Sequence, residues 1–429
     1  MVEQKTIIKR AELLKKVPQS IWALGFVSMF MDISSDFINS LLPIYMSSVL
    51  GISVIYIGLI EGIAEALVLM IKIFSGVLSD IIKKRKIFAV MGYGLSACAK
   101  LIFPFASSVG VLLSARVIDR LGKGLRDAPR DALLGELAPA SIRGLCFGLR
   151  QALDNVGAFI GPIIAMITLA IFTHIGHIDH DFRALFWIAV IPAFLSVLLL
   201  IIGVKEPKRE QNEEEKKEEG SKNVFLDQAN NPVTFSFKVL CNFGPRYWLV
   251  VAAATVLMFA RFSQAFLVLR STTVGMPFAL APLVIIIMNV VSAISSYYAG
   301  YLSDSINRLF FIIAGFIVLV ASDIILGYAT NPWHLIGGVI LWGLHLGLTQ
   351  GIFDALIVDT TESHVRGSAF GVFNFICGIA IIISNLVAGF MWMHYSPAVT
   401  FFVGAGFTVG ALVFFVIKLA LNHSRLYKK

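Results

Sequence analysis

Apolar runs long enough to cross a membrane recur along the whole chain. A bilayer core about 30 Å thick needs about 20 apolar residues in a helix. Only 14% of the 429 residues are charged, against about 25% in soluble proteins. The chain lacks the alternating pattern of a membrane barrel, so we expect an all-α polytopic membrane protein. Twelve predicted spans cover residues 21–49, 54–79, 87–106, 109–137, 145–173, 184–204, 246–270, 276–302, 308–329, 334–360, 368–394 and 397–420.

The segment KEPKREQNEEEKKEEGSKN, residues 205–223, divides these spans six and six. It is polar and free of aromatic residues, which is typical of flexible linkers. Lysine and arginine gather in loops on the side of this linker, which predicts that both termini are cytoplasmic. The net charge of +8 therefore sets orientation and does not indicate nucleic-acid binding. The expected parts are a cytoplasmic N-terminal segment, a six-helix bundle, a cytoplasmic linker, a second six-helix bundle and a tail, at residues 1–20, 21–204, 205–245, 246–420 and 421–429.

The two halves of the sequence repeat one another. GVLSD at residues 76–80 returns as GYLSD at residues 300–304. RDALLGELAPASIRGLCFG at 130–148 returns as FDALIVDTTESHVRGSAFG at 353–371, at nearly the same offset. Two matches in equivalent spans indicate a duplication. We expect two pseudo-symmetric six-helix bundles around a central cavity.

The segment RVIDRLGKGLRDAPRDAL, residues 116–133, is charged although it lies within the fourth predicted span. At 100° per residue, its charged side chains fall within an arc of about 140°. A solvated loop has no reason to keep that phase, so we predict a helix with one charged stripe. Each charge would cost about 3 kcal/mol or more in hydrocarbon, so the stripe must face water or protein. The stripe consists of Arg116, Asp119, Arg120, Lys123, Arg126, Asp127, Arg130 and Asp131.

Charged and polar residues lie at similar depth in the other spans and offer partners for this stripe. Two interpretations remain open, a static lattice of ion pairs and a polar cavity between the bundles. The cavity is favoured because apolar packing would hold helices together at a lower desolvation cost. The potential partners are Asp32, Asp36, Asn39, Glu61, Glu65, Lys72, Lys100, Arg150 and Asp154, with Arg261, His345, Asp354 and Asp359 in the second half. The expected substrate-cavity residues are Arg116, Lys123, Arg126, Asp127, Lys72, Lys100, Arg261 and His345.

Three motifs resemble those of the major facilitator superfamily of secondary transporters. GVLSDIIKKR, residues 76–85, resembles the family's loop Gly-x-Leu-x-Asp-Arg-x-Gly-Arg-Arg, with departures at Ile81 and Lys83. Arg120 and Gly124 match the Arg-x-x-x-Gly of the family's fourth span, whose arginine is associated with proton coupling. GLRQALDNVGAFIGP, residues 148–162, is similar to the fifth span of the family's antiporters, although Ala165 and Met166 replace a glycine pair.

The resemblance implies alternating access, with spans one, four, seven and ten lining the cavity. Asp36 is our first choice of proton carrier because it lies near mid-membrane in the first span. The alternative is a permanently ionised Asp36 paired with a base of the fourth span. The full set of expected proton-coupling residues is Asp36, Asp32, Glu61, Glu65 and Arg120. The expected gating residues are Gly76, Asp80, Lys84, Arg85, Asp304, Gly157, Gly161 and Pro162.

No nucleotide site or cofactor is expected. RLGKGLR lacks the spacing of a phosphate-binding loop, so an ion gradient must supply the energy. The four cysteines show no metal-ligand spacing. HIGHIDHD, residues 174–181, contains His174, His177 and His180, and is expected to be a solvated loop rather than a metal site. The protein is therefore not expected to be an enzyme.

The leading hypothesis is a proton-coupled secondary transporter of a small organic solute, with export by proton antiport favoured by the pattern in the fifth span. The alternative is a proton symporter that imports an organic anion, a carboxylate nutrient or a siderophore, as the excess of lysine and arginine near the cavity indicates. A membrane receptor that transports nothing is the rival from another class. We expect a monomer in a bacterial inner membrane, with a small-molecule substrate, protons and the lipid bilayer as partners, and no nucleic acid.

Overall fold

The computed structural model describes residues 16–82, 84–139, 142–175, 178–205, 243–303, 308–361 and 366–426, and these are helical without a strand. The first half contains α2 (Gln19–Ile44), which a π-helical turn η1 (Tyr45–Val49) extends, α3 (Val54–Ile82), α4 (Arg85–Ile102), α5 (Val109–Leu137), α6 (Arg143–Ile175) and α7 (Ile178–Gly203). The second half contains α10 (Pro245–Ala260), α11 (Ala265–Thr273), α12 (Leu283–Ser303), α13 (Arg308–Tyr328), α14 (Pro332–Thr360), α15 (Arg366–His394) and α16 (Pro397–Leu426). Short 3-10 turns lie at η2 (Phe103–Phe105) and η4 (Phe278–Leu280).

Each predicted span corresponds to helix, and the charged segment at 116–133 lies within the single helix α5, as its phase predicts. Span seven is the exception, because its helix is interrupted between α10 and α11. At the interruption, the backbone N–H of Ser263 donates to Oδ1 of Asn385 at 2.8 Å instead of to a helical carbonyl. The span predicted at residues 246–270 is thus present as Pro245–Thr273, but it consists of two helices rather than one. A side chain on α15 satisfies the broken backbone, as a helix inside a membrane requires.

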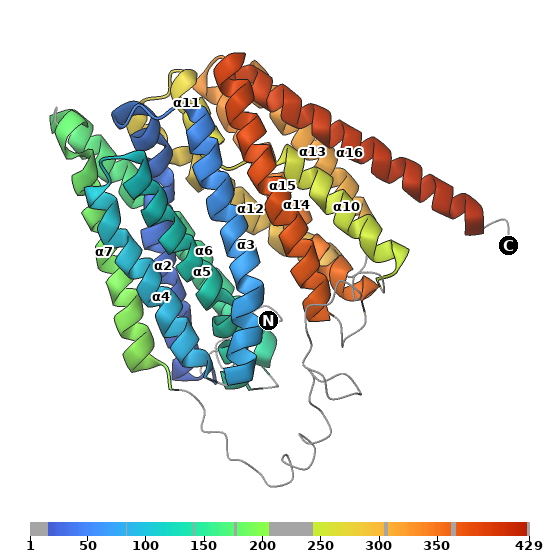
Figure 1. Ribbon diagram of the computed structural model, residues 1–429, viewed down its shortest axis with the longest axis horizontal. Helices are drawn as coiled ribbons and strands as arrows, with labels where there is room; N and C mark the ends of the chain where they lie inside the picture. Colours follow the sequence, from blue (N-terminus) through green and yellow to red (C-terminus); the bar gives the residue numbers. More distant parts are fainter. Residues whose placement is uncertain are drawn as a thin grey trace, which may run out of the picture.

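The helix packing of the second half reproduces that of the first (Figure 1). In the first bundle, α2 packs on α6 and α7, α5 packs on α3 and α4, and α4 packs on α7. In the second bundle, α10 packs on α15 and α16, α14 packs on α12 and α13, and α13 packs on α16. The sequence repeat is thus a structural repeat, and the two pseudo-symmetric six-helix bundles are confirmed.

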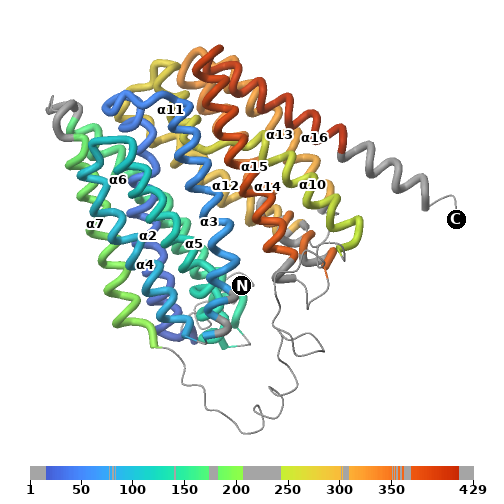
Figure 2. Tube along the Cα trace, viewed as in Figure 1, coloured from blue at the N-terminus to red at the C-terminus, as the bar shows by residue number. Residues whose placement is uncertain are grey.

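The bundles meet along two helix pairs, α3 with α15 and α6 with α12. Small residues permit the approach of α3 and α15, since a Cβ atom on Gly62 would lie 3.0 Å from Cβ of Asn385 and one on Gly389 would lie 2.7 Å from Cα of Ile55. In addition, α11 packs on α2 and α3, and η4 packs on α6. These contacts lie at the end opposite the linker, and the bundles splay apart towards the linker side (Figures 1 and 2).

Ten helical segments of the described residues are long and apolar enough to cross a membrane. The two remaining long helices, α5 and α14, fall outside this set. They are equivalent in the repeat, as the fourth helix of each bundle. With α5 and α14, the described residues form twelve long helical segments, six in each bundle.

Candidate transport site

A cluster of polar side chains joins α2, α3 and α5 inside the first bundle. Asn39 Oδ1 accepts hydrogen bonds from Arg116 Nη1 and from Arg120 Nη2, both at 2.7 Å. On its other side, Asn39 Nδ2 donates to Asp36 Oδ1 at 2.9 Å. Arg116 Nη2 also pairs with Glu61 Oε2 at 2.6 Å. We call Asp36, Asn39, Glu61, Arg116 and Arg120 the central cluster, and its members lie on three different helices.

The central cluster is incompletely satisfied. The Nε atoms of Arg116 and Arg120 and Oε1 of Glu61 are buried and make no hydrogen bond to any described residue. Two guanidinium groups converge on one neutral amide oxygen, and among the described residues Glu61 is the carboxylate that accepts a hydrogen bond from the pair. Buried donors of this kind are normally paired, so the arrangement suits a site where an acceptor from outside the protein binds.

Behind this cluster, Lys100 of α4 pairs with Asp119 of α5 at 2.7 Å. Lys100 Nζ also donates to Ser35 Oγ at 3.3 Å, and Asp119 Oδ2 lies 3.9 Å from Nε of Arg120. Lys100 has no exposed surface. It was expected in the substrate cavity, but the structure encloses it within the first bundle, where it supports Arg120 through Asp119.

Among the described residues, an electrostatic interaction reaches across the two bundles. Glu65 of α3 lies next to Ser263, at the break in span seven, and within electrostatic reach of Arg261. Arg261 in turn lies near His345 of α14. Nδ1 of buried His345 is 3.0 Å from the carbonyl oxygen of Gly315, which can only accept, so Nδ1 carries the proton. Nε2 of His345 makes no hydrogen bond to a described residue.

A second network occupies the linker-side end of α5, and we call it the linker-end network. Asp131 Oδ1 lies 3.0 Å from both Arg130 Nε and Arg150 Nη1. Arg150 Nη2 pairs with Asp154 Oδ2 at 3.2 Å, and Arg130 Nη1 lies 3.7 Å from Asp127 Oδ1. Each charge here has an opposite partner, so this part of the stripe fits the ion-pair lattice rather than a binding site.

Four further members of the expected site differ in their surroundings. The guanidinium of Arg126 lies 4.6 Å from the centre of the Tyr93 ring and is buried, which is a packing role. In contrast, Asp32, Lys72 and Lys123 make no ion pair with any described residue. Lys72 is exposed and the other two are partly exposed. Both lysines lie within electrostatic range of Asp127 of α5.

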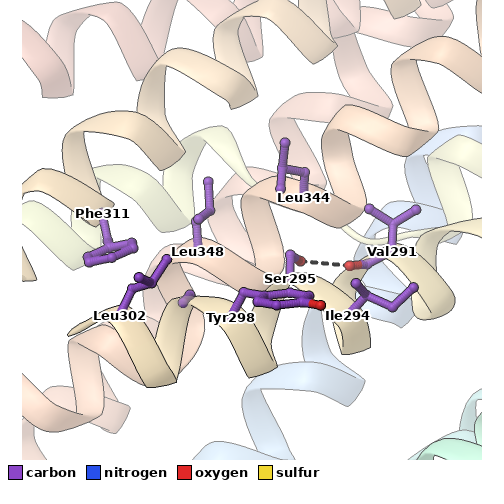
Figure 3. Close-up of a pocket in the computed structure, with 9 residues that line it drawn as sticks. Val291, Ile294, Ser295, Tyr298, Leu302, Phe311, Leu344 and Leu348 are labelled. Carbon is purple, nitrogen blue, oxygen red and sulfur yellow. Dashed lines mark hydrogen bonds between the residues drawn. The ribbon is translucent and has the colours of Figure 1, made fainter. Parts of the chain in front are cut away.

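One shallow hollow that the described residues form on the second bundle is apolar. It measures about 350 Å³ and lies between α12, α13 and α14. Its lining includes Tyr298, Leu344 and Phe311, and its Ser295 hydroxyl is occupied by the carbonyl of Val291 at 2.7 Å (Figure 3). No charged side chain lines it, so it is not the counterpart of the central cluster.

Comparison with known proteins identifies the family. The profile of the Major Facilitator Superfamily matches residues 24–385. The chain belongs to this superfamily. It is a membrane transporter and not an enzyme, as the motifs at 76–85, 120–124 and 148–162 imply.

Three relatives of this superfamily align over almost the whole chain. An uncharacterized MFS-type transporter of Methanocaldococcus jannaschii is 28% identical over 97% of this chain and 99% of its own. The staphyloferrin B transporter of Staphylococcus aureus is 27% identical over 92% and 93%. The cis,cis-muconate transport protein of Acinetobacter baylyi is 20% identical over 94% of both chains. In fold, the crystal structure of the nucleoside transporter NupG aligns with a TM-score of 0.73 at 14% identity, over 92% of this chain and 99% of that one.

The family loop motif is only partly described. Gly76 faces α5, where a Cβ atom would lie 3.4 Å from Cβ of Ala128. Arg85 does not remain in a loop, because it begins α4 and pairs with Glu136 of α5 at 2.8 Å. Lys84 is exposed. The side chain of Asp80 and all of Asp304 lie outside the described residues, as do the side chains of His174, His177 and His180.

The antiporter-like glycines of α6 pack on α2 of the same bundle. A Cβ atom on Gly157 would collide with the carbonyl oxygen of Met29, and one on Gly161 would lie 2.9 Å from the backbone N of Phe37. Pro162 follows within the same helix. The close helix contact expected from this spacing is thus present, and it brings α6 against the helix that carries Asp32 and Asp36.

The role of one site residue, Asn39, and one buried carboxyl group outside the site, Asp323, do not follow from the sequence reasoning. Asn39 was recognised on the polar face of span one, but its function as the link between two arginines and Asp36 depends on geometry across three helices. Asp323 of α13 is fully buried. A single acidic residue in the run FIVLVASDIILGY is a signal that the sequence offered.

Proposed function

We propose that this transporter moves a small organic anion by proton-coupled alternating access. The observation that carries the proposal is the convergence of Arg116 and Arg120 on the single neutral oxygen Asn39 Oδ1, at 2.7 Å each. A carboxylate is a better acceptor than an amide for two guanidinium groups, because it is charged and offers two oxygens. The unpaired Lys72 and Lys123 add positive charge along the way to the linker side.

Proton coupling is proposed through Asp36, which is joined to the arginines only through the Asn39 amide. A solute carboxylate that takes the place of Asn39 Oδ1 on the arginines would release the amide and bring negative charge close to Asp36. Repulsion between like charges then favours a protonated Asp36. Solute and proton would bind together under this arrangement, which is the requirement for symport.

The named relatives support an anionic solute. One transports staphyloferrin B, and another transports cis,cis-muconate, a dicarboxylate by its name. Import by proton symport is therefore supported by the electrostatic argument that a solute carboxylate favours a protonated Asp36. Export by proton antiport is the second candidate, and its support is the close packing of Gly157 and Gly161 of α6 on α2, in the pattern of the family's antiporters.

The test is transport by purified protein in proteoliposomes with an imposed pH gradient. Labelled cis,cis-muconate is the first probe, beside a panel of mono-, di- and tricarboxylates and a matched panel of organic cations. Accumulation of a carboxylate on the alkaline side indicates symport, and accumulation on the acidic side indicates antiport. Transport of cations with no carboxylate transported would refute the anion proposal, and transport indifferent to pH would refute proton coupling.

A further inference from the structure

Asp323 is a buried carboxyl group that the proposed transport cycle does not use. It lies in α13, on the last turns before that helix ends at Tyr328, and it has no exposed surface. Both carboxyl oxygens are without a hydrogen-bond partner among the described residues. A buried polar group of this kind is rare and needs an explanation.

The side chain of Asp323 borders a small space left by a glycine. A Cβ atom on Gly404 of α16 would lie 3.0 Å from Asp323 Oδ2, 3.2 Å from the Phe262 ring and 3.3 Å from the carbonyl oxygen of Ala260. Ala260 is the last residue of α10, at the interruption of span seven. Its carbonyl accepts no hydrogen bond from any described residue. A carboxyl group and an unpaired backbone acceptor therefore face the same gap.

The described residues of the helices packed around Asp323 provide no cationic side chain that would neutralise an ionised carboxylate there. Arg270 of α11 is occupied by the carbonyls of α13, at 3.1 Å from Leu326 O and 2.8 Å from Ala329 O. Arg261 faces Glu65, and His345 of α14 bonds to Gly315. The described side chains of α16 include no titratable group. None of the described cations forms an ion pair with Asp323.

We propose that Asp323 is a proton-binding site whose protonated carboxyl donates a hydrogen bond to the carbonyl of Ala260 and so holds the break between α10 and α11. Only the protonated form has a donor to offer, since an ionised carboxylate would meet a carbonyl oxygen across the gap with no donor near it. Gly404 is required because any side chain there would occupy the space between the two oxygens. One proton and one small rotation of the Asp323 side chain thus satisfy two buried groups at once.

The position of the break gives this proton a consequence for gating. α11 follows the break and packs on α2 and α3 of the first bundle, at the closed end opposite the linker. A proton on Asp323 fixes the direction in which α11 leaves α10, and therefore favours closure at that end. The inference goes beyond the proposed transport function and holds for any solute, because Asp323 touches neither the central cluster nor the unpaired lysines.

The protonation of Asp323 is tested directly by infrared spectroscopy of the reconstituted protein. The wild type is expected to show a carboxylic-acid C=O stretching band at neutral pH that Asp323→Asn removes. Ser322→Ala, a change at the neighbouring residue, serves as the control and should retain the band. An unchanged carboxylic-acid region in Asp323→Asn would overturn the proposal, because Asp323 would then be ionised.

The hinge role is tested by distance measurements between spin labels on opposite bundles. Labels are placed at Ser48→Cys and Thr273→Cys, both exposed at the closed end, in a chain whose four native cysteines are replaced by alanine. Asp323→Asn keeps a neutral donor and is expected to preserve the short distance. Asp323→Leu, of similar size without a donor, is expected to lower the ratio of closed to open molecules about two- to tenfold, the effect of one hydrogen bond.

Gly404→Ala, which separates the two oxygens without touching Asp323 chemically, is expected to shift the same ratio in the same direction as Asp323→Leu. Equal distance distributions in the Asn and Leu variants would overturn the hinge role, even if the infrared band shows that Asp323 is protonated. Neither readout depends on transport, so failure here is distinguishable from failure of the anion proposal.

Discussion

Replacement of Asp36 by asparagine is expected to separate proton coupling from solute movement. Asp36 Oδ1 accepts from Asn39 Nδ2 at 2.9 Å, and Asn39 connects Asp36 to the two arginines. Asparagine has the same size and retains an acceptor oxygen, so this hydrogen bond can persist. The charge-assisted bond becomes a neutral one, a loss of about 1 kcal/mol. The solute site stays assembled, and only the group that exchanges a proton is removed.

The size of the effect follows from the energy of one proton. One pH unit is worth about 1.4 kcal/mol per proton, which supports about a tenfold solute gradient when one proton moves with each solute. The wild type is therefore expected to accumulate solute about tenfold at a difference of one pH unit. Asp36→Asn is expected to reach a ratio of about one, while exchange of internal for external solute proceeds at a rate close to that of the wild type.

The assay uses proteoliposomes loaded with unlabelled solute for exchange, and empty proteoliposomes with an imposed pH gradient for accumulation. Asp131→Asn is the matched control, since Asp131 lies in the linker-end network between Arg130 and Arg150, at 3.0 Å from each. It should keep its response to pH. Loss of exchange together with accumulation in Asp36→Asn would show that Asp36 binds solute or supports the fold. Full accumulation in that variant would show that Asp36 is not the proton carrier. The next candidates are Asp32, Glu61 and Glu65.

Three further predictions concern residues of the first bundle that surround Asp36. Arg120→Lys should reduce solute exchange more than tenfold at unchanged thermal stability, because an ammonium group cannot replace the planar fork that reaches Asn39; wild-type exchange would contradict this. Lys100→Met should destabilise the protein by about 3–5 kcal/mol, because buried Asp119 loses its close partner and keeps only the longer contact with Arg120. Lys100→Met combined with Asp119→Leu should recover most of this loss in thermal melts. Gly157→Leu should abolish transport and lower the melting temperature, since no side chain fits against α2; a stable, active variant would disprove that packing.

The sequence predicts the fold well because its evidence is local. Hydrophobic length defines each span, and the phase of the charges in residues 116–131 distinguishes a helix from a loop without any knowledge of neighbours. The break after Ala260 could not be found in this way. Its cause is the Asn385 side chain on α15, which binds the Ser263 backbone across 122 positions of sequence. The unpaired carboxyl of Asp323 is equally a product of packing that no local pattern specifies.

In the candidate site, too, local features are predictable from the sequence and contacts between helices are not. Spacing places Asp36 and Asn39 on one face of α2, and Arg116 and Arg120 on one face of α5, so the residue types at the site are predictable. Their pairing is not, because the choice of Asn39 as the shared acceptor depends on how α2 and α5 approach each other. Lys100 illustrates the failure, since its charge and depth resemble those of a cavity residue, yet Asp119 encloses it within the bundle.

The distribution of ionic contacts also indicates how the bundles move. The pairs Glu61–Arg116, Lys100–Asp119 and Asp131–Arg150 each join two helices of the first bundle. Breaking any of them would leave a buried charge unpaired, so we infer that this bundle moves as a rigid body. Among the described residues, the bundles contact each other mainly along α3 and α15, where small residues permit close packing, and Glu65 interacts electrostatically with Arg261 across the same boundary. A transition to the opposite state must therefore rearrange the packed surface between α3 and α15 as well as the interaction of Glu65 with Arg261 beside the break in span seven.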